Sequence, residues 1–155
     1  MRLIHRPSVV ERLIDRLRSG RAKLADEVSA RAIQIDPSAD HAALARTVLA
    51  GFSQQPCLVA AHEWGIWPSS DNWFLFDTLS KYWFGRTHRI ETMAFEAGER
   101  AEAQTMLQIA LQSGWGAVLF VGDDEWFYFD HDGQALVSPN EIASDIGNVR
   151  GVSLV

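Results

Sequence analysis

The stretch between residues 62 and 73 holds the densest collection of side chains that could do chemistry. Its members are an ionisable pair, three tryptophans and a carboxylate with its amide neighbour: His62, Glu63, Trp64, Trp67, Trp73, Asp71 and Asn72. An imidazole next to a carboxylate can serve as a general base with the group that orients it, or as a pair of metal ligands. One hypothesis is therefore a hydrolase-type catalytic site in this stretch.

The alternative for the same residues is structural. No second histidine follows His62 at zinc-binding spacing, and neighbouring residues on an extended chain point to opposite faces. Ser70 or Asp71 would cap the helix that follows, while His62 hydrogen-bonds within the fold. Since no nucleophile completes a catalytic set, the structural interpretation is favoured and no catalytic residue is assigned. Should the chain be an enzyme, its catalytic residues are expected to be His62, Glu63, Asp71 and His88.

A further candidate lies at residues 86–91, where His88 and Glu91 are three positions apart. On a helix this spacing would place both side chains on one face, where they could bind a metal ion. The stretch has the composition of a turn that enters a strand, so a surface loop is favoured. We expect no metal site and no cofactor.

Acidic residues flank an aromatic run in the last third of the chain. The carboxylates are Asp123, Asp124, Glu125, Asp130 and Asp132, and the run between them is Trp126, Phe127, Tyr128 and Phe129. The spacing at residues 130–133 is similar to part of a calcium loop but lacks the remaining ligands and the distal glutamate. Hairpin turns explain these carboxylates better than a metal loop does.

The aromatic run leaves two interpretations open. A strand with one solvated face should alternate apolar and polar residues, and four successive aromatics break that rule. Either the strand is covered on both faces, which is favoured, or Trp126 and Tyr128 lie on an exposed aromatic surface with a carboxylate rim. The second form would be a protein-docking surface, to which Trp64 and Trp67 are assigned as further binding residues.

The net charge of −6 is unevenly spread along the chain. Residues 1–31 hold eight Lys or Arg against four Asp or Glu, a balance of +4, whereas residues 32–155 hold six against sixteen, a balance of −10. An acidic body repels nucleic acid, and the basic stretch interleaves both signs as a solvated helix face does. A basic protein is the expected partner, and no nucleic acid or membrane partner is expected.

Size and composition indicate a single globular domain over residues 1–155. Of these residues 47% are hydrophobic and 22% charged, which is enough to bury a core of its own. The single Cys57 excludes an intramolecular disulfide, and its apolar neighbours indicate an inert buried thiol. No stretch has the length of a membrane span and the first residues lack the apolar run of a signal peptide, so a cytoplasmic location is expected.

Helices dominate the expected first half of the chain. Ser8 opens a capping box, and residues 1–20 are expected to hold an amphipathic helix whose apolar face offers a homodimer contact as a further alternative. Residues 21–35 are ambiguous between a helix and a short strand. Further elements are predicted as a helix over 38–50, a buried strand over 57–61 and a helix over 72–84.

The second half is expected to hold most of the strands. Alternation over 89–95 predicts a strand, and the clearest helix follows over 99–113. Three strands separated by turn residues are expected over 117–121, 125–130 and 134–138. The residues 138–141 predict a short closing helix. Helices early and strands late predict an α+β fold, with a mostly antiparallel sheet of about four to five strands packed by about four to five helices.

The segment Trp64–Ser70, continued by Asn72-Trp73, resembles a motif in a group of small uncharacterised bacterial proteins. Residues Leu107–Trp115 and Asp130-His131-Asp132 are similar to later parts of those proteins, and the aromatic run is heavier here than in that pattern. The resemblance implies a shared fold and carries over no activity and no catalytic residue. Small acidic bacterial proteins of this kind include toxin-neutralising immunity proteins, an analogy at the level of the fold.

Charge, aromatic content and the incomplete catalytic set together favour a non-enzymatic protein-binding module. The expected form is an immunity- or antidote-type inhibitor of a basic bacterial toxin or effector. The alternative is a small hydrolase-type enzyme with its site near His62, Glu63 and the tryptophans. Solvent access to Trp64, Trp67 and Trp126 discriminates between these interpretations, because buried rings would remove the docking surface.

Overall fold

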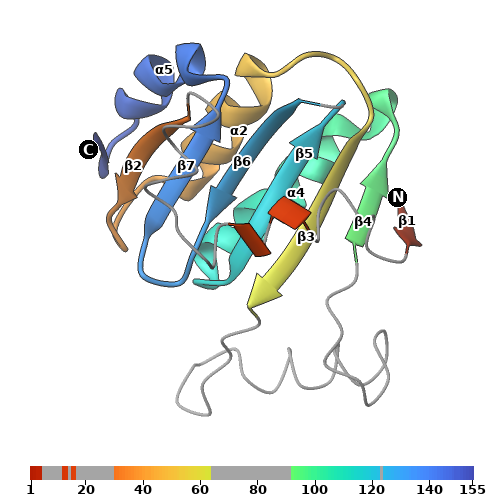
Figure 1. Cartoon of the computed structure of the whole chain (residues 1–155), viewed down its shortest axis with the longest axis horizontal. Coiled ribbons are helices and arrows are strands. Elements are labelled where there is room, and N and C mark those ends of the chain that lie inside the picture. Colours follow the sequence, from red (N-terminus) through yellow and green to blue (C-terminus); the bar gives the residue numbers. More distant parts are fainter. Residues whose placement is uncertain (5–11, 14, 17–29, 64–91, 123) are drawn as a thin grey trace.

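The computed structural model describes residues 1–4, 12–13, 15–16, 30–63, 92–122 and 124–155. Within them eight strands form one sheet in the order β1-β4-β3-β5-β6-β7-β2-β8, and all hydrogen-bonded neighbours are antiparallel (Figure 1). The strands are β1 (Arg2–Ile4), β2 (Arg31–Ile35), β3 (Cys57–Glu63), β4 (Thr92–Phe95), β5 (Gly116–Val121), β6 (Glu125–Phe129), β7 (Gln134–Ser138) and β8 (Val152–Leu154). The predicted α+β class with an antiparallel sheet is confirmed.

The sheet has more strands than the four to five expected. Two of the additional strands, β1 and β8, are three-residue strands at the two edges, which are too short to show an alternating pattern. The third is β2, in the stretch whose sequence is ambiguous. Ile33 and Ile35 are buried there and Gln34 is exposed, which is the alternation of a strand with two different faces.

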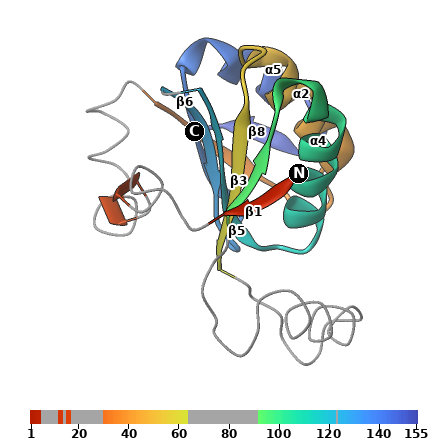
Figure 2. The same ribbon diagram turned by 90° about the vertical axis from the view of Figure 1, so that its right-hand side faces the viewer.

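Three α-helices among the described residues pack on one face of the sheet (Figure 2): α2 (His41–Gly51), α4 (Arg100–Gln112) and α5 (Ala143–Gly147). The carboxylate of Asp40 caps α2 by accepting a hydrogen bond from the Ala43 backbone N–H at 2.9 Å. The single-turn helix η1 (Ala97–Glu99) leads into α4, and the helix predicted over 99–113 is confirmed. The short turn η2 (Asn140–Ile142) and α5 form the expected closing helical segment.

The predicted N-terminal helix is only partly described. Residues 12, 13, 15 and 16 are helical, as predicted for that segment. Residues Arg2–Ile4, which the prediction placed in the same helix, instead form β1, because they pair with β4 at the edge of the sheet. The rest of the segment 1–20 and the helix predicted over 72–84 lie outside the described residues. The helix count of the whole chain therefore stays a prediction.

The larger core lies between the sheet and these helices. Alternate strand residues face it, among them Val59, Leu119 and Phe127, each at most 1% exposed. Cys57 belongs to the same core, and burial raises the pKa of its thiol. This placement agrees with the predicted inert thiol, because the reactive thiolate form is disfavoured there.

The opposite face of the sheet is also buried. Its cluster consists of Leu13, Ala60, Val118, Phe120, Trp126, Tyr128 and Leu136. Trp126 is 6% and Tyr128 2% exposed, while Phe127 and Phe129 pack on the helical side with ring centroids 5.7 Å apart. Strand β6 is thus covered on both faces, as favoured. The exposed-surface alternative for Trp126 and Tyr128 is contradicted, because both rings pack in the interior.

Strand β6 runs from one end of the sheet to the other, so the turns before and after it lie at opposite ends. The β5–β6 turn, residues 122–124, lies at one end, and the Gly122 backbone N–H donates there to the Pro56 carbonyl at 3.2 Å. The β6–β7 turn, residues 130–133, lies at the opposite end beside the last residue of β2. We call this second end the lower end, as drawn in Figure 1. At about 3.3 Å per residue, the length of β6 keeps the two turns well apart.

Candidate binding groove at the lower end of the sheet

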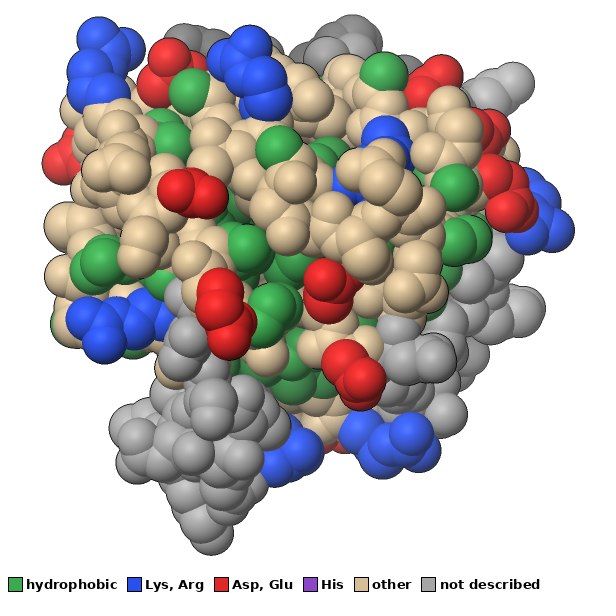
Figure 3. Space-filling model, turned by 90° about the horizontal axis from the view of Figure 1, so that it is seen from above, with side chains coloured by type: hydrophobic (Ala, Val, Ile, Leu, Met, Phe, Trp, Pro, Cys, Tyr) green, Lys and Arg blue, Asp and Glu red, His purple; other side chains and the backbone are tan. Residues whose placement is uncertain are grey.

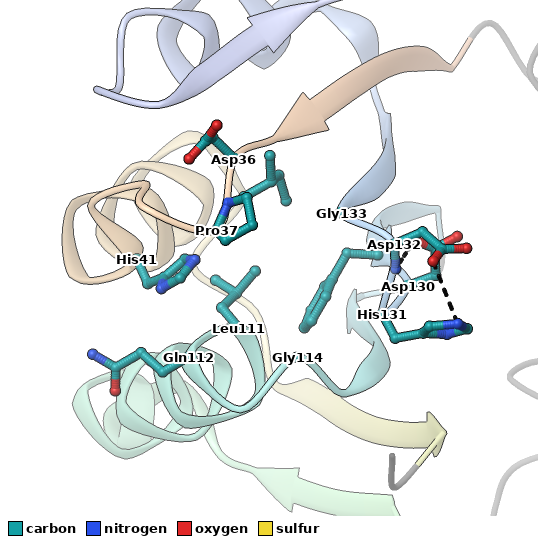
Figure 4. A pocket seen from close by; sticks show the side chains of 12 residues that line it. Asp36, Pro37, His41, Leu111, Gln112, Gly114, Asp130, His131, Asp132 and Gly133 are labelled. Atoms are coloured by element: carbon teal, nitrogen blue, oxygen red, sulfur yellow. Dashed lines mark hydrogen bonds and ion pairs between the residues drawn. The ribbon is translucent and has the colours of Figure 1, made fainter. Parts of the chain in front are cut away.

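Two adjoining cavities open at the lower end of the sheet. The first, of about 200 Å³, lies between the start of α2, the end of α4 and the β6–β7 turn (Figure 4), and is lined by Ile35, Asp36, Pro37, His41, Leu111, Gln112, Gly114, Phe129, Asp130, His131, Asp132 and Gly133. The second, of about 370 Å³, is lined by Gln34, Ile35, Asp36, Pro37, Asp132, Gly151, Val152 and Ser153. They share a wall made of Ile35, Asp36, Pro37 and Asp132, and together we call them the lower groove.

Asp36 is held in the shared wall by the turn that follows β2. Its Oδ1 accepts hydrogen bonds from the Ser38 backbone N–H at 2.7 Å and from the Ser38 hydroxyl at 2.6 Å. Its own backbone N–H donates to the Gly151 carbonyl at 2.8 Å. The bonds from Ser38 hold the pKa of the Asp36 carboxyl below its ordinary value. Asp36 therefore presents an exposed carboxylate, ionised at neutral pH, at the rim of the groove.

The β6–β7 turn builds the opposite wall. The Asp130 Oδ1 accepts from the backbone N–H of Asp132 at 3.0 Å and of Gln134 at 2.9 Å, and Asp130 is 3% exposed. Gly133 has a φ of +77°, and a Cβ at this position would overlap the Ile35 carbonyl oxygen. Asp130 therefore shapes the turn, whereas Asp132 lines the groove and has an exposed carboxylate that is directed toward His131 (Figure 4).

The two histidines of the groove do not face each other. His41 begins α2 and is half-buried, and burial lowers its pKa, an effect that the charge of Asp40 partly offsets. His131 is exposed, with its Nε2 3.5 Å from the Asp132 Oδ1. Figure 4 shows the His131 and Asp132 side chains turned away from His41. His41 therefore does not share a site with His131 and Asp132, and the 3.5 Å between the last two exceeds the hydrogen-bond reach of about 2.6–3.2 Å that joins a general base to its orienting group.

The inner wall of the first cavity is apolar. Ile35, Leu111 and Phe129 line it and are all buried. The end of α4 reaches the same wall, since Gln112 lines the cavity and Gly114 follows the helix with a φ of +64°. A helix C-terminus carries a negative partial charge. An apolar wall with a negative rim suits a long cationic side chain, whose stem is apolar and whose head is charged.

The acidic set predicted around the aromatic run is divided between the two ends of the sheet. Asp124 lies between β5 and β6 and Glu125 is the first residue of β6. The Glu125 Oε2 accepts from the Ser53 backbone N–H at 2.9 Å and from its hydroxyl at 2.5 Å. Asp130 and Asp132 lie at the lower end, of which only Asp132 is exposed. The prediction of one acidic edge is therefore wrong, because β6 separates its members.

Several predicted site residues lie outside the described residues. These are Trp64, Trp67, Asp71, His88 and Asp123, together with the side chains of His62 and Glu63. The backbone of β3 is described as far as Glu63, which pairs with Gly116, two residues from the lining residue Gly114. Strand β3 therefore ends at the lower end of the sheet, and the catalytic and tryptophan sets stay predictions.

Sequence reasoning missed Asp36, Pro37 and His41 as site residues. The Asp36-Pro37 pair has the composition of a turn and His41 that of a helix start, so each has a sufficient local explanation. They become part of a groove because Gly133 and the end of α4, both distant in the sequence, pack beside them. The available signal is the carboxylate-rich turn at residues 130–133, which the sequence indicates as a hairpin turn and as part of the carboxylate rim of the aromatic run.

Comparisons of this chain with known proteins do not show a family. Searches against family models, curated proteins and solved structures give no match.

Among the described residues, no group of three or more His, Cys, Asp and Glu side chains is placed to hold a metal ion. Within the same part of the chain, none of the helices combines the length and the apolar character needed to cross a membrane.

Proposed function

We propose that this chain is a non-enzymatic protein-binding module that docks a basic protein through the lower groove. The favoured form is an immunity- or antidote-type inhibitor of a basic bacterial toxin or effector. The observation that supports this most directly is the exposed carboxylate pair, Asp36 and Asp132, in the wall shared by two adjoining cavities. The described residues that line these cavities include no Lys or Arg, and the basic groups among them are the imidazoles of His41 and His131.

The charge of the whole chain supports the same partner class. Residues 32–155 carry a balance of −10, and Figure 3 shows Asp and Glu side chains interspersed with Lys and Arg over the end of the molecule opposite the lower groove. A negative surface attracts a positive partner over a distance of about 8–10 Å at physiological salt and accelerates encounter more than it strengthens the final complex. The dispersed carboxylates would thus steer the partner, and the groove would seat it.

The test is capture of partners from a lysate of the source cell with the full chain, at low salt and at 0.5 M salt, followed by mass spectrometry. We expect one protein of basic isoelectric point at stoichiometric amounts in the low-salt sample. Its association rate, measured with the purified pair, should fall by about tenfold or more as salt rises.

A matched pair of variants locates the contact. Asp36→Asn/Asp132→Asn removes two charges from the groove, and Asp124→Asn/Asp145→Asn removes two exposed charges elsewhere. The first pair should lower the affinity and the second should change mainly the association rate. Absence of any stoichiometric partner at low salt, or a partner whose association ignores salt, contradicts the proposal.

A hydrolase-type enzyme is the second candidate, and one observation favours keeping it. Strand β3 ends at the lower end of the sheet, so the His62-Glu63 pair begins beside the groove rather than at a remote edge. An activity screen with a broad ester, peptide and phosphoester panel, run on the wild type and on His62→Ala, tests this candidate. A turnover that the substitution abolishes would overturn the binding-module proposal, and a wild type inert across the panel would contradict the enzyme.

A further inference from the structure

We propose that the outer edge of β8 pairs with the same edge of a second copy of this chain, so that two sheets join into one. Strand β8 (Val152–Leu154) lies at one edge of the sheet, and β1 (Arg2–Ile4) lies at the opposite edge (Figure 1). An edge strand presents backbone N–H and carbonyl groups to which a further strand can bond. This inference goes beyond the proposed docking of a basic protein, because it concerns a different surface and a different partner.

The two edges of the sheet differ in charge. At β1, the Arg2 Nη2 lies 2.9 Å from the Glu96 Oε1, and the Met1 ammonium group pairs with Glu99. Charged side chains at an edge hinder the addition of another strand. Residues 152–155 are Val, Ser, Leu and Val, so β8 carries no charged side chain that would protect its edge.

The β8 edge also exposes large apolar side chains. Leu154 is 42% and Val155 74% exposed, and Met1 is the other large hydrophobic side chain that is exposed in the described part of the chain. Leu154 contacts α5 on its inner side, since a Cβ on Gly147 would lie 3.1 Å from the Leu154 Cγ. A second strand along this edge would remove the remaining apolar surface from water.

The pairing of β8 with β2 determines which backbone groups point outward. The Val155 N–H donates to the Ala32 carbonyl at 3.1 Å, and the Asp36 N–H donates to the Gly151 carbonyl at 2.8 Å. Successive residues of an antiparallel strand direct these groups to alternate sides, so the odd-numbered residues of this stretch bond to β2. The N–H and the carbonyl of Leu154 therefore point away from β2, toward the open side.

A second copy offers the groups that this edge needs. In an antiparallel pair centred on Leu154, the N–H of each Leu154 donates to the carbonyl of the other, and the two exposed side chains become neighbours. Such a contact is isologous, because both copies use the same surface. A three-residue strand supplies few such bonds, so we expect a reversible dimer.

Charge favours a second copy over a basic partner at this edge. A basic protein would find no carboxylate among the side chains of residues 152–155 and would be attracted elsewhere. Two copies, each with a net charge of −6, repel each other least where they meet through uncharged side chains. The β8 edge has this property, and the β1 edge does not.

Sedimentation equilibrium of the full chain between about 5 and about 500 µM tests the pairing. We expect the dimer fraction to rise with concentration. Added salt should strengthen the dimer, because it screens the repulsion between the two acidic chains. This dependence is opposite to that expected for docking of a basic protein. A monomer at every concentration, or a dimer that dissociates as salt is added, overturns the proposal.

Leu154→Lys places two like charges opposite each other at the centre of the interface. It should weaken the dimer by about tenfold or more. Thr105→Lys adds the same charge at an exposed position on α4 and should leave the dissociation constant within about twofold. Urea unfolding of both variants verifies that they are folded. A dimer that Leu154→Lys does not weaken more than Thr105→Lys does would contradict the role of the β8 edge.

Leu154→Cys gives a gain of signal that misfolding would not imitate. In a hydrogen-bonded antiparallel pair the Cα atoms lie about 5.5 Å apart, which a disulfide can span. With oxidised glutathione as the oxidant, Leu154→Cys should form a covalent dimer about tenfold faster than Thr105→Cys does. The native thiol, Cys57, is buried and should not compete. Equal rates for the two variants overturn the register centred on Leu154.

The edge pairing and the proposed docking fail in distinguishable ways. If the chain captures a basic partner but stays monomeric, the edge pairing is wrong and the protein-binding function stands. If it dimerises through Leu154 but captures no partner, the reverse holds. Loss of partner capture in Leu154→Lys, with a monomeric wild type, would assign the edge to that partner and overturn pairing between copies.

Discussion

Two aspartates of one turn, Asp130 and Asp132, have opposite roles. The first is buried and gives its Oδ1 to two backbone N–H groups of its own turn, while the second extends into solvent beside His131. A buried carboxylate that accepts hydrogen bonds from backbone donors stabilises the turn, and its removal would leave those donors without a partner. An exposed carboxylate can contact a partner from solvent, which is why the docking proposed at the lower groove rests on Asp132 and Asp36.

His41 predicts how stability depends on pH. Burial lowers its pKa below the ordinary value of 6.5, so the unfolded chain binds this proton more readily than the folded chain does. The free energy of unfolding should therefore fall as the pH decreases through about 6.5, and this contribution should level off below the pKa of the folded state. Urea titrations at pH 8.0, 7.5 and 5.5 measure the effect.

The variant His41→Gln removes the titrating group and provides the comparison. Its loss of stability between pH 7.5 and 5.5 should be smaller than that of the wild type. Between pH 8.0 and 7.5, where His41 is largely neutral in both states, the two proteins should behave alike. An identical acid-induced loss in both proteins would show that burial of His41 does not affect folding.

At the scale of elements, α2 is fixed at both ends by side chains of the rest of the fold. Asp40 caps its start, and Arg100 of α4 closes its end. The Arg100 Nη1 donates to the Ser53 carbonyl at 2.7 Å, and its Nη2 donates to the carbonyls of Leu49 and Phe52. The last carbonyls of a helix have no partner within it. One guanidinium therefore supplies this partner for the carbonyls of Leu49 and of the C-cap residue Phe52, binds the next carbonyl, Ser53, and ties α4 to α2.

Removal of this contact should destabilise the protein measurably. Arg100→Met keeps much of the apolar stem but removes the donors, and we expect a loss of about 2–3 kcal/mol in the free energy of unfolding. Arg46→Met, an exposed position on α2, is the matched control and should change it by less than about 0.5 kcal/mol. Urea-induced unfolding of the three proteins measures the difference. A loss of unfolding free energy no larger for Arg100→Met than for Arg46→Met would contradict this role of Arg100.

The elements also show what could be predicted from the sequence and what could not. Local signals located α4 and strands β5, β6 and β7, because their periodicity and turn residues lie within the elements themselves. The edge strands β1 and β8 carry no such pattern, since pairing with β4 and β2 alone makes them strands. The lower groove could not be predicted for the same reason, because it is formed by contacts between residues far apart in the sequence. One example is the Ile35 N–H, which donates to the carbonyl of Gly133, almost a hundred residues away.

At the scale of the molecule, the sheet has two buried faces and therefore two cores. Helices α2, α4 and α5 cover one face (Figure 2). On the other face, Leu13 is the described helical residue that belongs to the buried cluster. Trp126 and Tyr128 depend on that second cover. Because both faces of the sheet are covered, β6 has a continuous aromatic run instead of alternating apolar and polar residues.

Leu13→Ala tests this second cover. Leu13 is 8% exposed and contacts an aromatic cluster, so its truncation should lower the free energy of unfolding by about 2–3 kcal/mol. Arg12→Ala, on an exposed neighbour, should have an effect of less than about 0.5 kcal/mol. Tryptophan fluorescence during urea unfolding reports both variants. Equal stability of Leu13→Ala and the wild type would mean that the second core does not need this side chain.

The strand order has a consequence for biosynthesis. Strand β2 pairs only with β7 and β8, so Arg31 leaves the ribosome long before its partner Val137 exists. At about 5–20 residues per second, that interval lasts about 5–20 s. During it the nascent chain holds a strand with two isoleucines and no hydrogen-bonding neighbours, which is the kind of segment that is prone to aggregate until its partners are made. Such distant pairing also slows folding of the released chain, because loop closure must precede any gain from the sheet.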